Sequence, residues 1–398
     1  MQVRIRCGVW YGDNEKTLDL PDRWNVSVLQ PCGGASLSDD QLERAILNPV
    51  GSERLSLLSR GRKTAAIVCD DISRPTPCGR LLPFVLAELK AGGMADADIS
   101  IIIGSASHRP SMRQDLLKKL GHKVVGSHRI INHNPYARLT NLRTSSRGTP
   151  IYLNSSFMEA EVKVGIGTIL PHGATGFSGG AKIVVPGVAG IETIVANHGL
   201  ANTPRGILEG NAMRADAEEI GRQAGLDFIV NTLIDGALNL VGLFAGDAVD
   251  AHRAGVEAAR RVYLTEFPQN VDMVIANAYP ADTDFYQANK GLWKDLARSA
   301  RPGGYVLALA ECTEGLGFHG GVESGISIYR GKDETWTERN VSIVSPNLSI
   351  HDVGVVYPAS VKLFHNWHQV NEYLAAEGAL AQRLRVAVYP CAPIQLTG

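Results

Sequence analysis

Four side chains in this sequence could carry out chemistry together: His108, His172, Lys182 and His198. Histidine is the side chain best suited to moving protons near neutral pH, and a partly desolvated lysine can act as a nucleophile or covalent anchor. Three of the four lie within residues 171–198, which also contain a glycine-rich stretch. This grouping indicates a tethered or coordinated cofactor with acid and base groups beside it.

The glycine-rich stretch predicts a cofactor-binding loop. The backbone amides around Gly176, Ser178, Gly179 and Gly180 could point inward and cradle a phosphate. The stretch is neither a Walker A motif nor a dinucleotide fingerprint, and a tight turn before Lys182 would explain it equally well. The glycine-rich stretch alone is therefore weak evidence for phosphate binding, and its interpretation depends on the neighbouring residues.

The histidines leave two chemistries open. His198 follows the helix-like residues 190–197 and could ligate a metal beside a lysine-tethered group. His108, His172 and His198 could equally form a zinc site. Spacing alone does not separate these options.

Two further groups could bind an anionic substrate. Arg74 precedes Pro75, and a residue before proline avoids the α region, so its guanidinium is held outside helical geometry after a predicted strand. An arginine fork can grip a carboxylate or phosphate with two hydrogen bonds. Gln287 and Lys290, three apart, would share one helical face and could bind a carboxylate and a hydroxyl.

Short apolar runs recur along the chain, each followed by a polar or glycine-rich turn and then by a helical pattern. The predicted strands cover residues 64–70, 99–103, 160–165, 271–276 and 304–310. Continuous apolar strands separated by helices predict an α/β fold with parallel sheets covered on both faces. The candidate residues stand just after these strands, where open α/β sheets bind ligands.

The length of 398 residues and a break at 266–270 predict two domains. We expect an N-terminal cofactor-binding and catalytic domain over 1–268. A C-terminal α/β domain over 269–398 would complete the substrate site. Each domain is predicted to be a largely parallel sheet flanked by helices, with the active site in the crevice between the domains.

Composition excludes several classes of function. The net charge of -1, from 39 basic and 40 acidic residues, gives no electrostatic case for binding nucleic acid or an anionic membrane. No apolar run approaches the roughly 18 residues that span a bilayer. The N-terminus lacks the apolar core of a signal peptide, and the six scattered cysteines form no Cys-x-x-Cys pair. We therefore expect a cytoplasmic protein with reduced thiols.

The motifs together resemble the nickel-dependent lactate racemase family. The matching stretches run in consistent order from residue 71 to residue 317 and cover most of the chain. They are Asp71-x-x-Arg74-Pro75, His108-Arg109-Pro110, Pro171-His172 with Gly176-Phe177-Ser178-Gly179-Gly180-x-Lys182, Asn197-His198, Gly210-Asn211 with Arg214, Tyr286-Gln287-x-x-Lys290, and Glu311-Cys312-x-Glu314-Gly315-Leu316-Gly317.

The resemblance implies a racemase or epimerase that inverts the C2 centre of a 2-hydroxy acid by reversible hydride transfer. Its cofactor would be a nickel-pincer nucleotide, a pyridinium-3-thioamide-5-thiocarboxylic acid mononucleotide made by separate maturation proteins. By matching position, Lys182 would tether it and His198 would ligate nickel.

The resemblance also implies roles for the remaining residues. His108 and His172 would act as alternating base and acid on opposite sides of the substrate. Arg74, Gln287 and Lys290 would hold its carboxylate and hydroxyl, and Asp71 would meet the nucleotide.

Departures from the family pattern concern the substrate. Residues 173–175, Gly-Ala-Thr, are small where bulkier residues are common, Ala181 replaces a commonly basic residue, and Asn289 is polar where an apolar residue is frequent. These departures favour a substrate larger or more polar than lactate.

Two alternative functions compete with the racemase hypothesis. A zinc metallohydrolase would use the three histidines and carry no adduct on Lys182. A non-catalytic binding protein for an organic acid would rely on Arg74 and Lys290, and would keep its ligand affinity when His108 and His172 are replaced.

Overall fold

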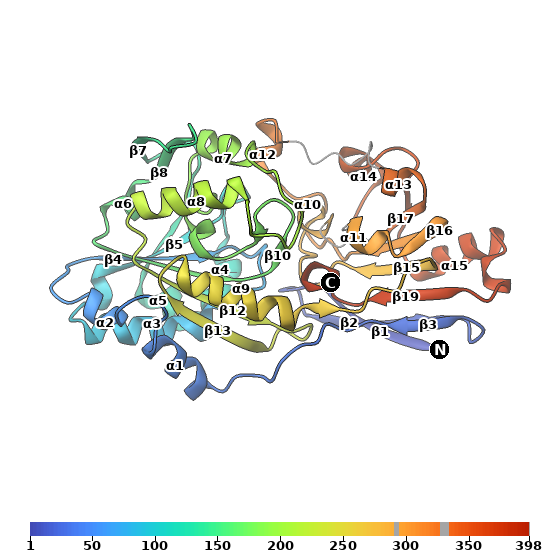
Figure 1. The fold of residues 1–398 in the computed structure, drawn as a ribbon, viewed down its shortest axis with the longest axis horizontal. Coiled ribbons are helices and arrows are strands. Elements are labelled where there is room, and N and C mark those ends of the chain that lie inside the picture. Colours follow the sequence, from blue (N-terminus) through green and yellow to red (C-terminus); the bar gives the residue numbers. More distant parts are fainter. Residues whose placement is uncertain (290–293, 327–333, 398) are drawn as a thin grey trace. The chain divides into compact units, whose positions relative to one another are not determined.

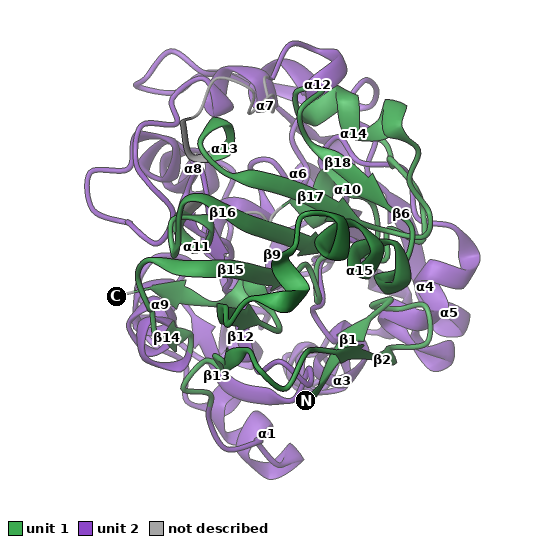
Figure 2. Ribbon diagram, turned by 90° about the vertical axis from the view of Figure 1, so that its right-hand side faces the viewer, with its two compact units in different colours: residues 1–33, 263–318, 327–398 green, residues 34–262, 319–326 purple. Residues whose placement is uncertain are grey.

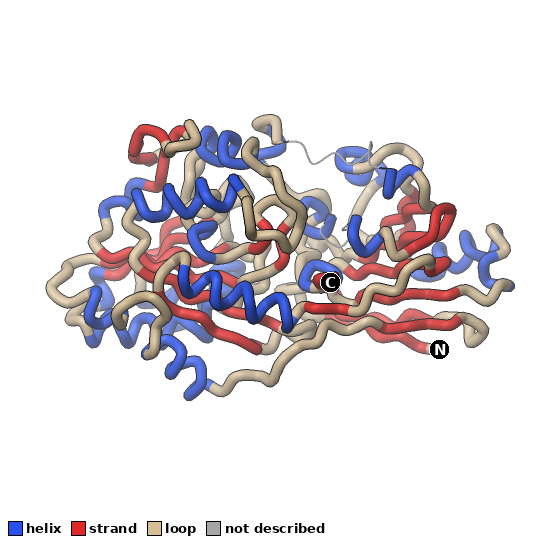
Figure 3. Tube along the Cα trace, in the orientation of Figure 1, coloured by secondary structure: helices blue, strands red, loops and turns tan. Residues whose placement is uncertain are grey.

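The computed structural model describes residues 1–289, 294–326 and 334–397. The chain forms two compact units, which Figure 2 colours separately. Unit 1 contains residues 1–33, 263–318 and 327–398, and unit 2 contains residues 34–262 and 319–326. Helices and strands alternate through both units, joined by the loops drawn in tan in Figure 3. None of the helices in the described ranges has the length and apolar character needed to cross a membrane.

Unit 2 is built on a six-stranded sheet with the order β13-β12-β9-β4-β5-β6. Figure 1 labels β4, β5, β12 and β13 of this sheet. Its strands are β4 (Ala65–Asp70), β5 (Ile99–Gly104), β6 (Arg129–Asn132), β9 (Val162–Thr168), β12 (Phe228–Ile234) and β13 (Leu240–Gly246). Neighbours pair in parallel except β12 and β13, which are antiparallel. Every residue of β9 and β12 is buried, as expected for central strands covered on both faces.

Ten helices and several short elements of the described residues complete unit 2. The helices are α1 (Asp39–Leu47), α2 (Leu55–Leu58), α3 (Cys78–Ala91), α4 (Arg113–Leu120), α5 (His122–Ser127), α6 (Ser155–Glu159), α7 (Ile191–His198), α8 (Ala212–Gln223), α9 (Asp250–Val262) and α12 (Gly320–Glu323). The short elements are the hairpins β7 (Leu139–Thr144) with β8 (Pro150–Asn154) and β10 (Pro171–His172) with β11 (Gly176–Phe177), and the 3-10 helices η1 (Asp96–Asp98) and η2 (Gly180–Ile183). Helix α9 packs on β12 and β13, α8 contacts η2, and α12 contacts α7.

Unit 1 contains a second six-stranded sheet, β18-β17-β16-β15-β19-β3, in which all neighbours are parallel. Its strands are β3 (Asn25–Val28), β15 (Val271–Asn277), β16 (Ala300–Leu309), β17 (Asn340–Val344), β18 (Lys362–Phe364) and β19 (Arg385–Tyr389). Alternate residues of β15 enter two different cores: Val274 belongs to one, and Met273 and Ile275 belong to the other. This sheet is therefore also covered on both faces.

The other elements of unit 1 are short or lie at the edges of the sheet. Two small strand pairs are β1 (Gln2–Cys7) with β2 (Asn14–Asp19) and β14 (Leu264–Thr265) with β20 (Leu396–Thr397). The helices are α10 (Phe285–Ala288), α11 (Lys294–Ala297), α13 (Glu334–Thr337), α14 (Ile350–Val356), α15 (Trp367–Ala376), η4 (Ala379–Ala381) and η5 (Ala392–Ile394).

Each large sheet has one point where the order of its strands reverses. In unit 2, β5 and β6 follow on one side of β4, whereas β9 and β12 lie on its other side. In unit 1, β16 to β18 lie on one side of β15 and β19 lies on the other. Ligands of open α/β sheets bind beside the carboxyl ends of strands at such a point. The segments that follow β4 and β9 carry Arg74 and His172 in unit 2, and the segment that follows β15 carries Gln287 in unit 1.

The predicted fold class, with two largely parallel sheets flanked by helices, is confirmed. The units differ from the predicted domains 1–268 and 269–398, because neither unit is continuous in sequence. Residues 1–33 belong to unit 1, where β3 pairs with β19, and residues 319–326 belong to unit 2. These pairings join segments that are far apart in the chain, so local sequence patterns do not reveal them.

Candidate active site

The loop after β4 begins with two aspartates that have different partners. Asp70 Oδ1 lies 2.7 Å from Lys119 Nζ, and Asp70 Oδ2 accepts a hydrogen bond of 2.5 Å from Thr76 Oγ1. Thr76 Oγ1 is also 2.7 Å from Thr168 Oγ1 at the end of β9. Burial raises the pKa of Asp70, and the positive charge of Lys119 opposes this rise. Asp70 therefore connects the ends of the two strands at the reversal point.

Asp71 pairs with His108, which follows β5. Asp71 Oδ2 is 2.7 Å from His108 Nδ1, and Asp71 Oδ1 accepts hydrogen bonds from Ser73 N at 3.1 Å and Ser73 Oγ at 2.5 Å. Burial alone would raise the pKa of Asp71, but the charge and hydrogen bond of His108, with Arg74 and Ser73, hold it below its usual value. An ionised carboxylate only accepts hydrogen bonds, so Nδ1 carries a proton in either charge state of the ring, and whenever the ring is neutral Nε2 has the lone pair. His108 is therefore oriented as a base.

Arg74 lies against the same pair of residues. Its Nη1 donates to Ser73 Oγ at 2.9 Å and to Ser73 O at 3.2 Å. Lys119 Nζ donates to the Arg74 carbonyl at 2.7 Å, which fixes the backbone before Pro75. The predicted anion-binding arginine is thus half-buried beside His108.

Residues 319–326, which we call the strap, pack on the His108 loop within unit 2. The His319 and His108 rings meet edge to face, with centroids 5.2 Å apart and planes at 65°. Gly320 N donates to Ser107 O at 2.7 Å, and Gly321 N donates to Ser107 Oγ at 3.0 Å. The strap therefore buries one side of the His108 ring and is held there by its backbone.

His172 lies on β10 and faces Lys182. Its Nδ1 accepts hydrogen bonds from Ala174 N at 3.1 Å and Thr175 N at 3.3 Å, and its Nε2 is 3.5 Å from Lys182 Nζ. Because two backbone amides donate to Nδ1, the proton of the neutral ring belongs on Nε2. His108 and His172 thus present Nε2 in opposite states.

Lys182 lies in η2, directly after the glycine-rich loop. Burial of its amine, and then the positive charges of Arg214 and Arg74, lower its pKa well below the usual value. The unusual environment of this lysine agrees with the nucleophile or anchor predicted for it.

At two positions of the glycine-rich loop, the backbone conformation and the close packing require glycine. Gly176 has φ of 69°, and a Cβ there would come within 2.2 Å of the Ile207 carbonyl oxygen. Gly180 has φ of 59°, and a Cβ there would meet the His252 ring at 2.8 Å. The Ser178 hydroxyl donates to Thr168 O at 2.6 Å and accepts from Leu170 N at 2.8 Å, which ties the loop to β9.

His198 is the last residue of α7, and its Nδ1 donates to the Ile194 carbonyl at 2.8 Å. Burial, and then the charge of Lys182, lower its pKa to about 4. The ring is therefore neutral near pH 7 and keeps the Nε2 lone pair that a metal would need. Among residues 1–289, 294–326 and 334–397, no group of three or more His, Cys, Asp or Glu side chains could hold a metal ion. The alternative of a zinc site built from three histidines gains no support.

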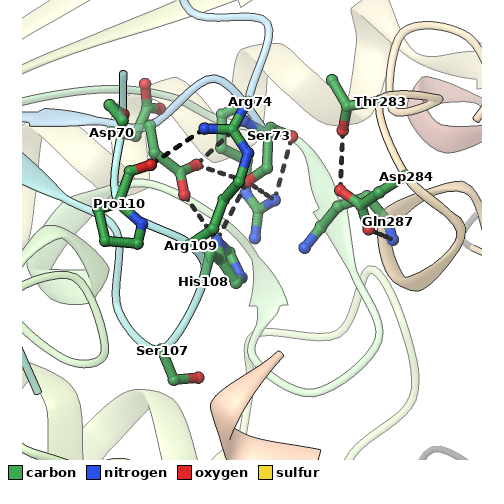
Figure 4. A network of polar contacts seen from close by, with 12 residues as sticks. Asp70, Ser73, Arg74, Ser107, His108, Arg109, Pro110, Thr283, Asp284 and Gln287 are labelled. Atoms are coloured by element: carbon green, nitrogen blue, oxygen red, sulfur yellow. Dashed lines mark hydrogen bonds and ion pairs between the residues drawn. The ribbon is translucent and has the colours of Figure 1, made fainter. Parts of the chain in front are cut away.

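Unit 1 carries the remaining predicted residues. Gln287 lies in α10, and its backbone amide donates to the N-cap Asp284 at 3.1 Å. Thr283 Oγ1 donates to the same carboxylate at 3.0 Å (Figure 4). The Gln287 side chain is buried. Lys290 lies outside the described residues.

Within unit 2 the predicted residues form two contacting groups. Asp71, Arg74 and His108 form one, and His172 and Lys182 form the other. Electrostatics join them, because Arg74 acts on the pKa of Lys182, and Lys182 and His108 act on that of His198.

Sequence reasoning gave no role to several residues that the structure places beside these groups. They are Ser73, Arg214, His252 and His319. Arg214 entered only as part of the matched pattern. One signal was present for His319, which stands among glycines in Gly317-Phe318-His319-Gly320-Gly321, much as His108 follows small residues.

Comparisons with known proteins point to one family. Residues 11–206 match the lactate racemase N-terminal domain family. The lactate racemase of Thermoanaerobacterium thermosaccharolyticum is 32% identical over 323 residues, which are 78% of this chain and 75% of the relative. That of Lactiplantibacillus plantarum is 32% identical over 291 residues, which are 71% of this chain and 68% of the relative.

Solved structures extend the similarity to the whole chain. The lactate racemase apoprotein of T. thermosaccharolyticum has a TM-score of 0.78 and 25% identity, with 100% of both chains covered. A Thermotoga maritima protein shares the fold, with a TM-score of 0.68 and 16% identity over 92% of this chain and 100% of its own. The resemblance predicted from the motifs is thereby confirmed. This chain belongs to the lactate racemase family and is an isomerase.

Proposed function

We propose that this protein inverts the C2 centre of a 2-hydroxy acid, using a nickel-pincer nucleotide tethered to Lys182. The observation that carries the proposal is the opposite proton placement on two histidines: His108 offers a lone pair at Nε2, and His172 carries a proton there. Inversion needs a base on one side of the substrate and an acid on the other. The lactate racemases named above support the reaction class.

The residues present fit the cofactor. His198 offers one neutral nitrogen donor, and no three-ligand protein site accompanies it among the described residues. A metal would need its other ligands from a bound group, and sulfur donors of a tethered pincer would supply them. Lys182 offers an amine for the tether, and the loop at Gly176, Ser178, Gly179 and Gly180 offers backbone amides for the nucleotide. The chemistry that such a group would supply when bound is reversible hydride acceptance.

The protein's own part is to move protons and hold the substrate. His108 Nε2 takes the hydroxyl proton of one enantiomer, and Asp71 stabilises the resulting imidazolium. For the other enantiomer the two histidines exchange roles, and His172 is the one that takes the hydroxyl proton. To act as an acid stronger than neutral imidazole, His172 must also be protonated at Nδ1, so the turn at 173–175 has to withdraw its amides.

For substrate binding we propose the roles that the resemblance gives. Arg74, Gln287 and Lys290 bind the carboxylate and hydroxyl, and Asp71 also meets the nucleotide. The small turn at 173–175 favours a 2-hydroxy acid larger or more polar than lactate. We further propose cytoplasmic location and cofactor-maturation proteins as partners.

The test is to produce the protein with nickel and the cofactor-making machinery, then measure intact mass, nickel content and racemisation of a panel of 2-hydroxy acids. We expect an adduct of nucleotide size on Lys182, about one nickel per chain, and loss of about 10²–10⁴-fold in kcat for His108→Ala or His172→Ala. Zinc without an adduct would favour the hydrolase. Retained ligand affinity in both variants, with no hydrogen exchange at C2, would favour the binding protein.

A further inference from the structure

Arg214 is a buried arginine whose guanidinium donates hydrogen bonds to the glycine-rich loop. It is 2% exposed, and its Nη1 donates to the Gly179 carbonyl at 2.9 Å. Its Nη2 donates to the Phe177 carbonyl. The start of α8 fixes the backbone of Arg214, because Asn211 Oδ1 accepts from Arg214 N at 2.8 Å. One side chain thus holds two carbonyls of the loop that leads into Lys182.

His252 holds the carbonyl between those two. Its Nε2 donates to Ser178 O at 2.9 Å, and its ring is fully buried in α9 under the loop. Three consecutive carbonyls, at residues 177, 178 and 179, therefore accept hydrogen bonds from buried side chains of two helices. The loop cannot rotate these peptides without leaving buried donors unsatisfied.

The start of α8 also holds the His172 turn. Asn211 Nδ2 donates to the Ala174 carbonyl at 3.0 Å. This places the amides of 174 and 175 on His172 Nδ1 and the proton of the ring on Nε2. A proton on Nε2 is donated toward Lys182 Nζ, which must then offer a lone pair. At 3.5 Å this contact is long, and the hydrogen-bond pattern favours an uncharged amine.

The charges around Lys182 agree with this preference. Among the described residues no carboxylate forms an ion pair with Arg214; the charge of Glu218, one turn later and 3.6 Å from Arg253, raises the pKa of Arg214, but burial outweighs it. The groups that act on the amine are His172, Arg74, Arg214 and, from α7, His198. Both arginines are positive, so they disfavour a charged lysine.

We propose that Arg214 is a positioning residue that presents Lys182 as an uncharged, nucleophilic amine before the cofactor arrives. The inference rests on the proposed tether at Lys182. On this proposal Lys182 is already uncharged in the folded protein because of Arg214 in α8, and the nucleotide does not have to deprotonate it.

The test uses full-length, cofactor-free protein and a small acylating probe, N-hydroxysuccinimidyl acetate. The amine attacks the acetyl carbon, the ester bond breaks, N-hydroxysuccinimide leaves, and the amine proton goes to solvent. Acetylation of each lysine is followed by peptide mass spectrometry between about pH 6 and pH 10. We expect Lys182 to react with a midpoint clearly below those of exposed lysines such as Lys90, with about tenfold more reactive amine at neutral pH for each pH unit of difference.

Variants separate charge from geometry. Arg214→Gln should move the Lys182 midpoint upward and slow its acetylation at neutral pH. Arg214→Lys should keep the low midpoint but increase hydrogen–deuterium exchange at 176–183, because one ammonium cannot hold both carbonyls as the fork does. Arg261→Gln is the matched control: this arginine lies in the last turn of α9, is exposed and should change neither readout.

A wild-type midpoint equal to that of exposed lysines would overturn the proposal without any variant. A folded Arg214→Gln protein with the wild-type midpoint, or an equal shift in Arg261→Gln, would also overturn it. Failure of the proposed function is distinguishable, because it would leave Lys182 without a nucleotide adduct after maturation while the acetylation midpoint stays low.

Discussion

At the scale of single residues, the partner of each Nδ1 decides what a histidine in this site can do. An ionised carboxylate on His108 Nδ1 leaves Nε2 as an acceptor, whereas backbone amides on His172 Nδ1 leave Nε2 as a donor. The third histidine, His198, donates through Nδ1 to a helix carbonyl and keeps Nε2 for a ligand bond. Three identical side chains therefore have three different roles set by short-range hydrogen bonds.

Replacing Asp71 with asparagine should remove the preference of His108 for its productive tautomer. An amide can donate to Nδ1, which moves the ring proton to Nε2 and blocks the base. We expect kcat/KM of nickel-loaded enzyme to fall on the order of 10²–10⁴-fold. The equilibrium constant of the reaction is unchanged, so the loss must be equal in both directions. The measurement is racemisation from each enantiomer.

Loading must be matched in that comparison, by nickel content and by the mass of the Lys182 adduct. Asp39→Asn is a suitable control, because Asp39 is exposed and forms an ion pair with Arg80 rather than with a histidine. Near-wild-type turnover by fully loaded Asp71→Asn protein would remove Asp71 from the role of orienting His108.

At the scale of elements, the sequence predicted the parts of the site that follow strands. The apolar runs at 64–70 and 99–103 became β4 and β5, and Asp71, Arg74 and His108 follow them as expected. Such strands can be predicted from the sequence because a strand buried on both faces is apolar throughout. The strap could not be predicted from the sequence, since it is short, rich in glycine and paired with a residue more than 200 positions earlier.

The strap gives a prediction at this scale. His319→Ala removes the ring that packs edge to face on His108, an interaction worth about 0.5–1.5 kcal/mol. We expect kcat to fall about 2–10-fold with little change in KM. His319→Phe keeps an aromatic edge and should recover most of the loss. Steady-state kinetics of equally loaded proteins would measure this, with the exposed His368→Ala as control. Equal losses in the Ala and Phe variants would show that packing on His108 is not the cause.

At the scale of the whole molecule, the sequence predicted two parallel α/β bodies but not which segments belong to each. The order of apolar runs and helices is local information, whereas the pairing of β3 with β19 joins residues more than 350 positions apart. Buried polar residues were missed for the same reason. Nothing in the pattern of α8 or α9 shows that Arg214 and His252 meet the same loop from two helices.

Histidines whose pKa is lowered by burial make the stability of unit 2 depend on pH. They are His198, described above, and two more deeply buried ones, His133 and His252. His133 is 2% exposed, its Nε2 donates to Ala189 O at 2.8 Å, and burial lowers its pKa to about 4. His252 is fully buried, and burial lowers its pKa well below the usual value. Both are neutral in the folded protein at pH values where an unfolded chain would protonate them.

The unfolded chain takes up a proton at each of these positions near pH 6.5, whereas folded His133 takes it up only near pH 4. Between these values the unfolded state binds more protons, so the free energy of unfolding must fall as the pH falls, by up to about 1.4 kcal/mol per pH unit for each histidine. Urea unfolding at about pH 7.5, 6 and 5 would measure this slope. His133→Gln should reduce the slope by the share of one histidine, although the variant starts from lower stability because its hydrogen bonds to Ala189 and Asn154 change. The exposed His368→Gln should leave the slope unchanged. An unaltered slope in His133→Gln would mean that His133 is not held neutral by burial, and the acid sensitivity would have to come from other groups.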